Sequence, residues 1–242
     1  MKPLLIKELN SFFSSPIAYL VIGIYLVING LFLWVFEGDF NILHAGFADL
    51  NSYFFIAPWI FIFLIPAVTM RSFSDEINTG TIEILKTKPI TNWQIILAKF
   101  TSALILITIA ILPTLIYIYS IYQLGNPFGN IEFGTTFGSY IGLLFLVSAY
   151  SAIGIFASTI SKNQIVSFII GVFICFFLFY GFEALASYNT LGNLDYTIQN
   201  FGMYSHFESI SKGILDTRDL IYFISITFFF LVLTNYRLQD EK

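Results

Sequence analysis

The sequence predicts an all-α integral membrane protein with six transmembrane helices in one domain that covers residues 1–242. Of the 242 residues, 57% are hydrophobic and only 11% are charged. A soluble protein of this size cannot cover so much apolar surface with so few polar side chains. The charged residues are also absent from six long apolar segments, and a helix needs roughly 20 such residues to cross a bilayer. Both observations place the chain in a membrane.

The six segments contain no Asp, Glu, Lys or Arg, and they cover residues 17–36, 50–70, 100–122, 137–160, 165–182 and 220–236. A charge at the centre of a transmembrane helix costs about 2.5–3.5 kcal/mol, so spans retain ionisable residues chiefly where function needs them. Their absence argues against proton or sodium coupling. It also argues against catalysis inside the membrane. The first segment is too long for a signal-peptide core, and we expect it to remain as an uncleaved span.

The positions of lysine and arginine predict the orientation. With a cytoplasmic N-terminus, nine of the eleven Lys and Arg residues fall in cytoplasmic segments. Because positive charge favours the cytoplasmic side, we expect both termini and residues 71–99 to be cytoplasmic and residues 183–219 to be extracytoplasmic. The net charge of -4 and the absence of a basic cluster argue against binding to nucleic acid.

Residues 1–15 are predicted to form an amphipathic helix that lies in the cytoplasmic interface of the bilayer. The apolar side chains fall within about 120° of a helical projection, and Pro16 ends the helix. They are Leu5, Ile6, Leu9, Phe12 and Phe13. The alternative is a loosely ordered N-terminal tail.

The cytoplasmic connection 71–99 carries strong turn and capping signals and is too polar to lie in lipid. Ser72 and Asp75 have the spacing of a helix start, and Gly80 permits a sharp reversal. A short helix is predicted over residues 81–86, ending before Pro89. Thr91 and Gln94 then form a capping box that begins the third span. We expect a folded loop that transmits force to that span, and the alternative is an ordered loop with no partner.

The fourth span opens with glycines at four-residue spacing and continues with further small residues, a pattern that favours close approach between helices. The residues are Gly134, Gly138, Gly142, Ser151 and Gly154. The contact could lie within one subunit or with an identical or related subunit.

The extracytoplasmic segment 183–219 contains an apolar stripe at Phe207, Ile210, Ile214 and Leu215. This spacing predicts a short helix that dips into the outer interface or re-enters the bundle, after which Asp216 and Thr217 would cap the last span.

The chain lacks the motifs of an enzyme. It has no P-loop, no H-E-x-x-H and no nucleophile elbow. His44 and His206 have no second ligand at metal spacing, so we expect no metal site, and Cys175 is expected to be a packing residue. Any energy source must therefore reside in another protein.

Three stretches of the sequence resemble ABC-2-type transporter permeases. They are Lys7–Tyr19, the loop sequence Arg71–Leu85 with Lys88–Ile90 and Trp93–Lys99, and the segment His206–Leu220. Within that family the chain is most similar to the permease subunits of gliding-motility transporters, and permeases for nitrous-oxide-reductase maturation are close relatives.

The resemblance implies a permease of the bacterial inner membrane that works with a second permease subunit, identical or related, and with a separate ATP-binding subunit. No cofactor is expected on this chain, because ATP and Mg²⁺ would bind to that partner. The resemblance also assigns contact with the ATPase, as a coupling helix, to one set of loop residues: Asp75, Glu76, Asn78, Thr79, Gly80, Thr81, Glu83, Leu85, Lys88 and Pro89.

The leading hypothesis is therefore an exporter permease of a gliding-motility system that moves its substrate by alternating access. One alternative is a non-transporting membrane anchor of a motility or secretion complex. Another is a permease for copper or nitrous-oxide-reductase maturation. The spans contain no arrangement that selects a substrate.

Overall fold

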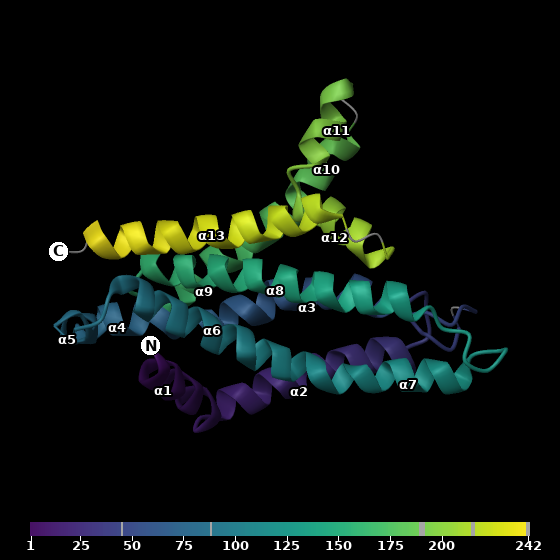
Figure 1. The fold of residues 1–242 in the computed structure, drawn as a ribbon, viewed down its shortest axis with the longest axis horizontal. Helices are drawn as coiled ribbons and strands as arrows, with labels where there is room; N and C mark the ends of the chain where they lie inside the picture. The colour runs from purple at the N-terminus through teal and green to yellow at the C-terminus, as the bar shows by residue number, and fades with distance from the viewer. Residues whose placement is uncertain (45, 88, 189–191, 214–215, 241–242) are drawn as a thin grey trace.

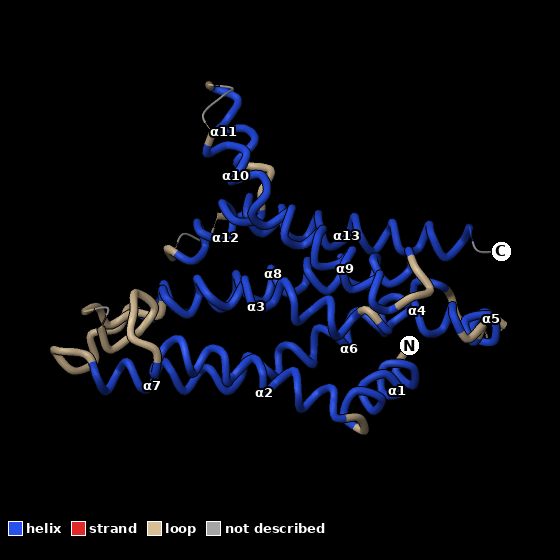
Figure 2. Tube along the Cα trace, turned by 180° about the vertical axis from the view of Figure 1, so that it is seen from behind, coloured by secondary structure: helices blue, strands red, loops and turns tan. Residues whose placement is uncertain are grey.

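The computed structural model describes residues 1–44, 46–87, 89–188, 192–213 and 216–240. Every regular element in these ranges is helical, in agreement with the predicted all-α class (Figure 2). Six helical segments are long and apolar enough to cross a membrane: Pro16–Val35, Asn51–Asn78, Asn92–Leu124, Phe133–Ile160, Gln164–Ser187 and Thr217–Gln239. They match the six apolar segments of the sequence in number and order.

Short irregular turns and connections divide these segments into the elements labelled in Figure 1. In chain order they are α1 (Lys2–Phe13), α2 (Pro16–Gly30), η1 (Leu31–Val35), α3 (Asn51–Thr69), α4 (Arg71–Asn78), α5 (Thr81–Lys86), α6 (Asn92–Ile111), η2 (Leu112–Thr114), α7 (Leu115–Leu124), α8 (Phe133–Ile160), α9 (Gln164–Phe176), η3 (Phe177–Gly181), α10 (Phe182–Ser187), α11 (Asn193–Gln199), α12 (Met203–Ser211) and α13 (Thr217–Asp240).

The second span is longer than the sequence indicated. The helix continues past Met70, which keeps right-handed helical dihedrals, so α3 and α4 are nearly continuous. The predicted helix start at Ser72 and Asp75 is therefore wrong. Its physical reason is that no side chain caps a helix end here: the Ser74 hydroxyl donates to the Met70 carbonyl within the helix, and the Asp75 carboxylate accepts from Gln164.

Three helices form the centre of the bundle. Most residues in the apolar cores of the spans that contain α3, α6 and α8 are buried, whereas less than a third are buried in the spans that contain α2, α9 and α13. Large aromatic side chains such as Tyr53, Phe61 and Tyr150 fill the core. The exposed faces of the outer helices remain apolar, with Val27, Phe173 and Phe228 more than half exposed. In a membrane, lipid or another apolar protein surface covers such faces.

Both ends of the chain lie at one end of the bundle, together with α1, α4 and α5 (Figure 1). We call this the terminus end. The predicted N-terminal helix is present as α1, which contains no buried residue. At the opposite end, the loops after α2 and α7 lie beyond the bundle, while α10 and α11 project from its side.

The predicted extracytoplasmic helix is present as α12, which packs on α8 through Met203, Phe207 and Ile210. Ile214 and Leu215 of the predicted stripe lie outside the described residues. The Asp216 carboxylate accepts the backbone N–H of Arg218 at 2.9 Å, so it caps α13 as predicted.

Candidate functional site

A tight helical hairpin, α4–α5, extends from the second span at the terminus end. Gly80 joins the two helices with φ +70°, a left-handed conformation that glycine adopts without steric cost. The Thr79 N–H and hydroxyl both donate to the Asp75 carbonyl, at 2.9 and 2.7 Å. The Thr79 and Thr81 hydroxyls lie 3.0 Å apart. The sequence had predicted this reversal and the bounds of α5 correctly.

Residues of the predicted coupling set fall into two groups in this hairpin. The tip is exposed and consists of Asn78, Thr79, Gly80, Thr81 and Glu83. Pro89 is also exposed, Leu85 is half-buried, and Lys88 lies outside the described residues.

Asp75 and Glu76 form the second group and face the bundle rather than the tip. The Asp75 carboxylate accepts from the side-chain amide of Gln164, whose carbonyl oxygen accepts from Arg71 Nε at 3.1 Å. This pair of contacts ties α4 to the start of α9.

Glu76 binds a buried cation. Lys99 is 2% exposed, and its Nζ donates to Glu76 Oε1 at 2.9 Å and to Glu8 Oε1 at 3.3 Å. The exposed Lys7 lies 3.8 Å from Glu8 and 4.0 Å from Glu76. This cluster joins α1, α4 and α6 beside a polar cavity of about 250 Å³. The sequence did not predict this cluster, because Lys99 lies 91 residues from Glu8 and 23 residues from Glu76 along the chain.

The third span begins at the predicted capping box. The Thr91 hydroxyl accepts the Gln94 N–H at 3.3 Å, and the Gln94 side chain accepts the Thr91 N–H at 3.2 Å. The hairpin therefore lies between the second span, with which α4 is nearly continuous, and the third span, whose start is fixed by the capping box.

One residue of the tip was not singled out from the sequence. Ile84 on α5 is 63% exposed and lies beside Glu83. A single exposed apolar side chain is common on protein surfaces, so Ile84 alone does not define a contact with another protein. The signal was present in the sequence as an isoleucine on the opposite side of α5 from Ile82, which is buried.

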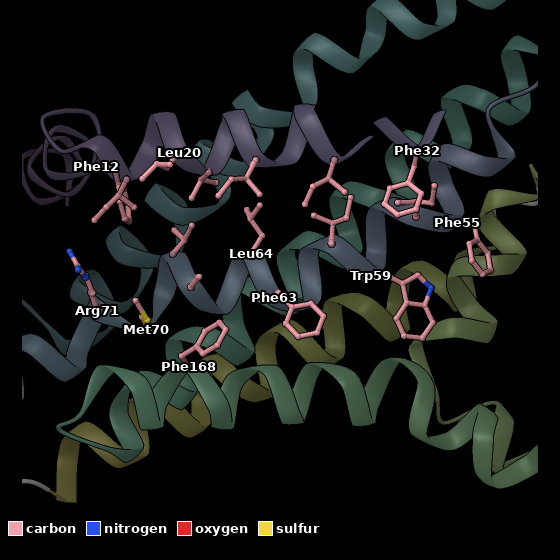
Figure 3. A pocket seen from close by; sticks show the side chains of 18 of the residues that line it. Phe12, Leu20, Phe32, Phe55, Trp59, Phe63, Leu64, Met70, Arg71 and Phe168 are labelled. Carbon is pink, nitrogen blue, oxygen red and sulfur yellow. The ribbon is translucent and has the colours of Figure 1, made fainter. Parts of the chain in front are cut away.

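A long apolar groove runs between α2 and α3, with Phe168 of α9 at one wall (Figure 3). Its volume is about 890 Å³, within the range of about 300–1,000 Å³ that is common for small-molecule sites. Phe12 and Arg71 lie at its terminus end, and Phe32 and Phe55 lie at the other. Among the described residues that line it, Arg71 is the one that carries a charge.

A chain of buried hydroxyl groups crosses the bundle near the opposite end. Tyr25 and Tyr53 are 2.8 Å apart at their hydroxyls, Tyr53 lies 3.0 Å from the Thr114 hydroxyl, and Thr114 lies 3.1 Å from that of Tyr140. The chain connects α2, α3, η2 and α8. The sequence showed only scattered hydroxyl groups, because their convergence depends on helix packing.

The small residues of α8 make their close contacts within the chain. A Cβ added at Gly142 would lie 2.6 Å from Ile210 of α12, and one at Gly154 would clash with the Thr69 hydroxyl of α3. Gly138 and Ser151 are buried. Gly134 has no atom within 4 Å of its Cβ position. Close approach at Gly134 is therefore absent.

The part of the chain that the structure describes contains no group of three or more His, Cys, Asp and Glu side chains that could hold a metal ion. His206 instead pairs with Asp219, 2.6 Å from its Nδ1, and its Nε2 lies 2.9 Å from the Asn200 carbonyl. Its ring stacks on Tyr222. These contacts fasten α12 and the end of α11 to α13.

Comparison with known proteins identifies the family. The family model described as "ABC-2 family transporter protein" matches residues 8–242. No curated protein matches the chain. The matched region includes all six long helices and the α4–α5 hairpin. On the strength of this match over nearly the whole sequence, the chain belongs to the ABC-2 family of transporter proteins.

Proposed function

We propose that the chain is the permease subunit of an ATP-driven exporter, and that a separate ATP-binding subunit docks on the tip of the α4–α5 hairpin. Membership of the ABC-2 family supports a membrane permease subunit and an ATP-binding partner. The terminus end would then face the cytoplasm. This orientation agrees with the sequence, in which nine of the eleven Lys and Arg residues fall in the segments predicted to be cytoplasmic.

The observation that carries the proposal is the construction of the hairpin. Its tip, residues 78–84, is exposed apart from the buried Ile82, while α4 is tied to α9 through Asp75 and to α6 through Glu76. A coupling element needs an exposed surface for its partner and a rigid connection to the spans. Because α4 is bound to α6 and α9, a displacement of the tip would be transmitted to these helices.

The apolar groove is proposed as half of the substrate pathway. It lies along α2 and α3, and less than a third of the residues in the span that contains α2 are buried. A second permease subunit, identical or related, would close the groove and complete the pathway. Alternating access would follow from movement of the two subunits as the ATPase closes.

Two substitutions in the tip test the docking assignment. Gly80→Pro is incompatible with φ +70° because proline fixes φ near -65°, and Glu83→Arg reverses an exposed charge. Each is expected to lower co-purification of the ATP-binding subunit by roughly tenfold, about 1.4 kcal/mol, and to abolish the stimulation of ATP hydrolysis by the permease. The permease itself should stay in the membrane.

The matched control is Gly46→Pro. Gly46 has φ +74°, and like Gly80 it has no atom near its Cβ position, but it lies in the loop after the first span at the opposite end. Its variant should retain the ATPase. Normal ATPase binding and stimulation in both tip variants would overturn the docking assignment.

The same preparation separates transport from anchoring. A transporter should show substrate-stimulated ATP hydrolysis or nucleotide-dependent movement of a substrate after reconstitution into vesicles. A stable complex that shows neither would be a non-transporting anchor.

The role in gliding motility, and export as the direction of transport, rest on the resemblance of the N-terminal, loop and C-terminal stretches to gliding-motility permeases. Deletion of the gene in a gliding host is expected to stop spreading on agar, and the intact gene should restore it. Normal gliding with impaired copper-site assembly in nitrous-oxide reductase would favour the alternative permease.

A further inference from the structure

We propose that Lys99 is a positioning residue that makes α1 move together with the α4–α5 hairpin, so that docking at the tip reaches the wall of the apolar groove. This inference rests on the proposed function, because it assigns the internal route by which that docking acts.

Lys99 is the shared contact of three elements. It lies on α6, binds Glu76 of α4 at 2.9 Å and binds Glu8 of α1 at 3.3 Å. Its Nζ also sits 5.1 Å from the centre of the Phe73 ring. With 2% exposure it has almost no access to water, so the two carboxylates take the place of its hydration.

The two carboxylates depend on Lys99 in the same way. Glu8 and Glu76 are 13% and 16% exposed, and Glu76 Oε2 is buried without a hydrogen-bond partner in the described part of the chain. Separation of Glu76 from Lys99 would deprive a buried ammonium and a largely buried carboxylate of their shortest ionic contact, so α4 and α6 are expected to move together.

α1 lies on the surface of the bundle, where it packs against α6 and α2. It contains no buried residue and meets the bundle through half-buried side chains such as Leu4, Phe12 and Phe13. α1 has two ionic contacts with other helices: the Glu8–Lys99 pair at 3.3 Å, and a longer contact of 4.0 Å between Lys7 and Glu76. The Glu8–Lys99 pair is the shorter of the two, and Lys99 is buried whereas Lys7 is exposed. A displacement of the hairpin therefore reaches α1 through this pair.

The route then continues into the membrane. Only Ser14 and Ser15 separate α1 from α2, and the Ser15 hydroxyl donates to the Phe12 carbonyl at 3.0 Å, which shortens the connection. Phe12 of α1 and Ile17 and Leu20 of α2 line the groove. Movement of α1 would thus change the groove at its terminus end.

The decisive variant is Glu8→Gln. It weakens the link to α1 but leaves Lys99 paired with Glu76, so the fold of the hairpin and of α6 should persist. Lys99→Met removes the link altogether, and Lys99→Arg keeps the charge. Lys7→Gln is the matched control, because Lys7 lies on the same helix near the same carboxylates but is 61% exposed.

The readout is the distance between spin labels on cysteines placed at Asn10 of α1 and at Lys162 in the α8–α9 connection, both exposed. The single native cysteine, Cys175, is replaced by alanine. Distances are measured on the permease co-purified with its ATP-binding subunit, without nucleotide and after trapping with ATP and vanadate. ATP hydrolysis and the amount of folded complex are measured in parallel.

The parent protein, Lys7→Gln and Lys99→Arg are expected to show a nucleotide-dependent change in this distance. Glu8→Gln and Lys99→Met should lose it while the ATP-binding subunit stays bound. An unchanged shift in Glu8→Gln would overturn the proposal, since α1 would then follow the hairpin without the ionic link. A parent complex that lacks ATPase binding altogether would instead count against the proposed function.

Discussion

At the scale of single residues, Gly154 sets the distance between the second and fourth spans. A Cβ there would lie 3.1 Å from Thr69 Cβ and 3.6 Å from the Pro66 backbone, and it would clash with the Thr69 hydroxyl. That hydroxyl cannot rotate away freely, because it donates to the Ile65 carbonyl at 2.9 Å. We expect Gly154→Ala to lower the free energy of unfolding by about 1–3 kcal/mol, the usual cost of overpacking, as measured by thermal unfolding in detergent.

Gly134 of the same helix provides the control for Gly154. No atom lies near its Cβ position, so Gly134→Ala should be neutral or stabilise the protein by up to about 1 kcal/mol through helix propensity. If both substitutions change the free energy of unfolding equally, helix propensity, rather than the contact between α8 and α3, determines that change.

At the scale of elements, the buried hydroxyl chain fixes α2, α3 and α8 relative to one another. Tyr53 stands in its middle, between the hydroxyls of Tyr25 and Thr114. Tyr53→Phe would leave the buried Tyr25 hydroxyl without this partner, and we expect a loss of about 1–2 kcal/mol in the free energy of unfolding. Tyr150→Phe is the comparison, because the Tyr150 hydroxyl is buried with no hydrogen-bond partner in the described residues.

The outcome for Tyr150→Phe follows from the same physics. Removal of an unpaired buried hydroxyl deletes a desolvated polar group, so this variant should be as stable as the parent or more stable. If both variants lose the same stability in thermal unfolding, the aromatic packing is responsible and the hydroxyl chain contributes nothing.

Local signals allowed the elements themselves to be predicted. Charge-free runs predicted six spans, Gly80 predicted the reversal, and Thr91 with Gln94 predicted the start of α6. Each depends on residues close together in the chain. The continuity of α3 with α4 was not predicted, because Ser72 and Asp75 have the spacing of a helix start, whereas no side chain caps α4 in the folded protein and the Asp75 carboxylate binds Gln164.

Contacts between segments far apart in the chain could not be predicted from such local signals. The Lys99–Glu8 pair spans 91 residues and the Asp75–Gln164 pair spans 89. Each member has the appearance of an ordinary interfacial polar residue until the packing of α1, α4, α6 and α9 brings the partners together. The residues predicted to contact the ATPase were therefore treated as one surface. In the structure, residues 78–81 and 83 form an exposed tip, whereas Asp75 and Glu76 face the bundle.

At the scale of the whole molecule, the fold brings the polar contacts of the hairpin to the end that carries both termini. The ties to α1, α6 and α9 all lie there, and the opposite end carries α12 and the loops after α2 and α7 (Figure 1). If the terminus end is cytoplasmic, every element that a cytosolic ATPase could contact is already connected to a membrane span.

Labelling of single cysteines on intact cells tests this orientation. In a Cys175→Ala background, cysteines replace Lys162 at the terminus end and Phe128, which is 63% exposed in the loop after α7. Because lysine and arginine concentrate at the terminus end and positive charge favours the cytoplasm, a membrane-impermeant maleimide should label position 128 in intact cells and position 162 only after permeabilisation. The opposite pattern would put the hairpin outside the cell, out of reach of any cytosolic ATPase, and the proposed docking at Gly80 and Glu83 would fall with it.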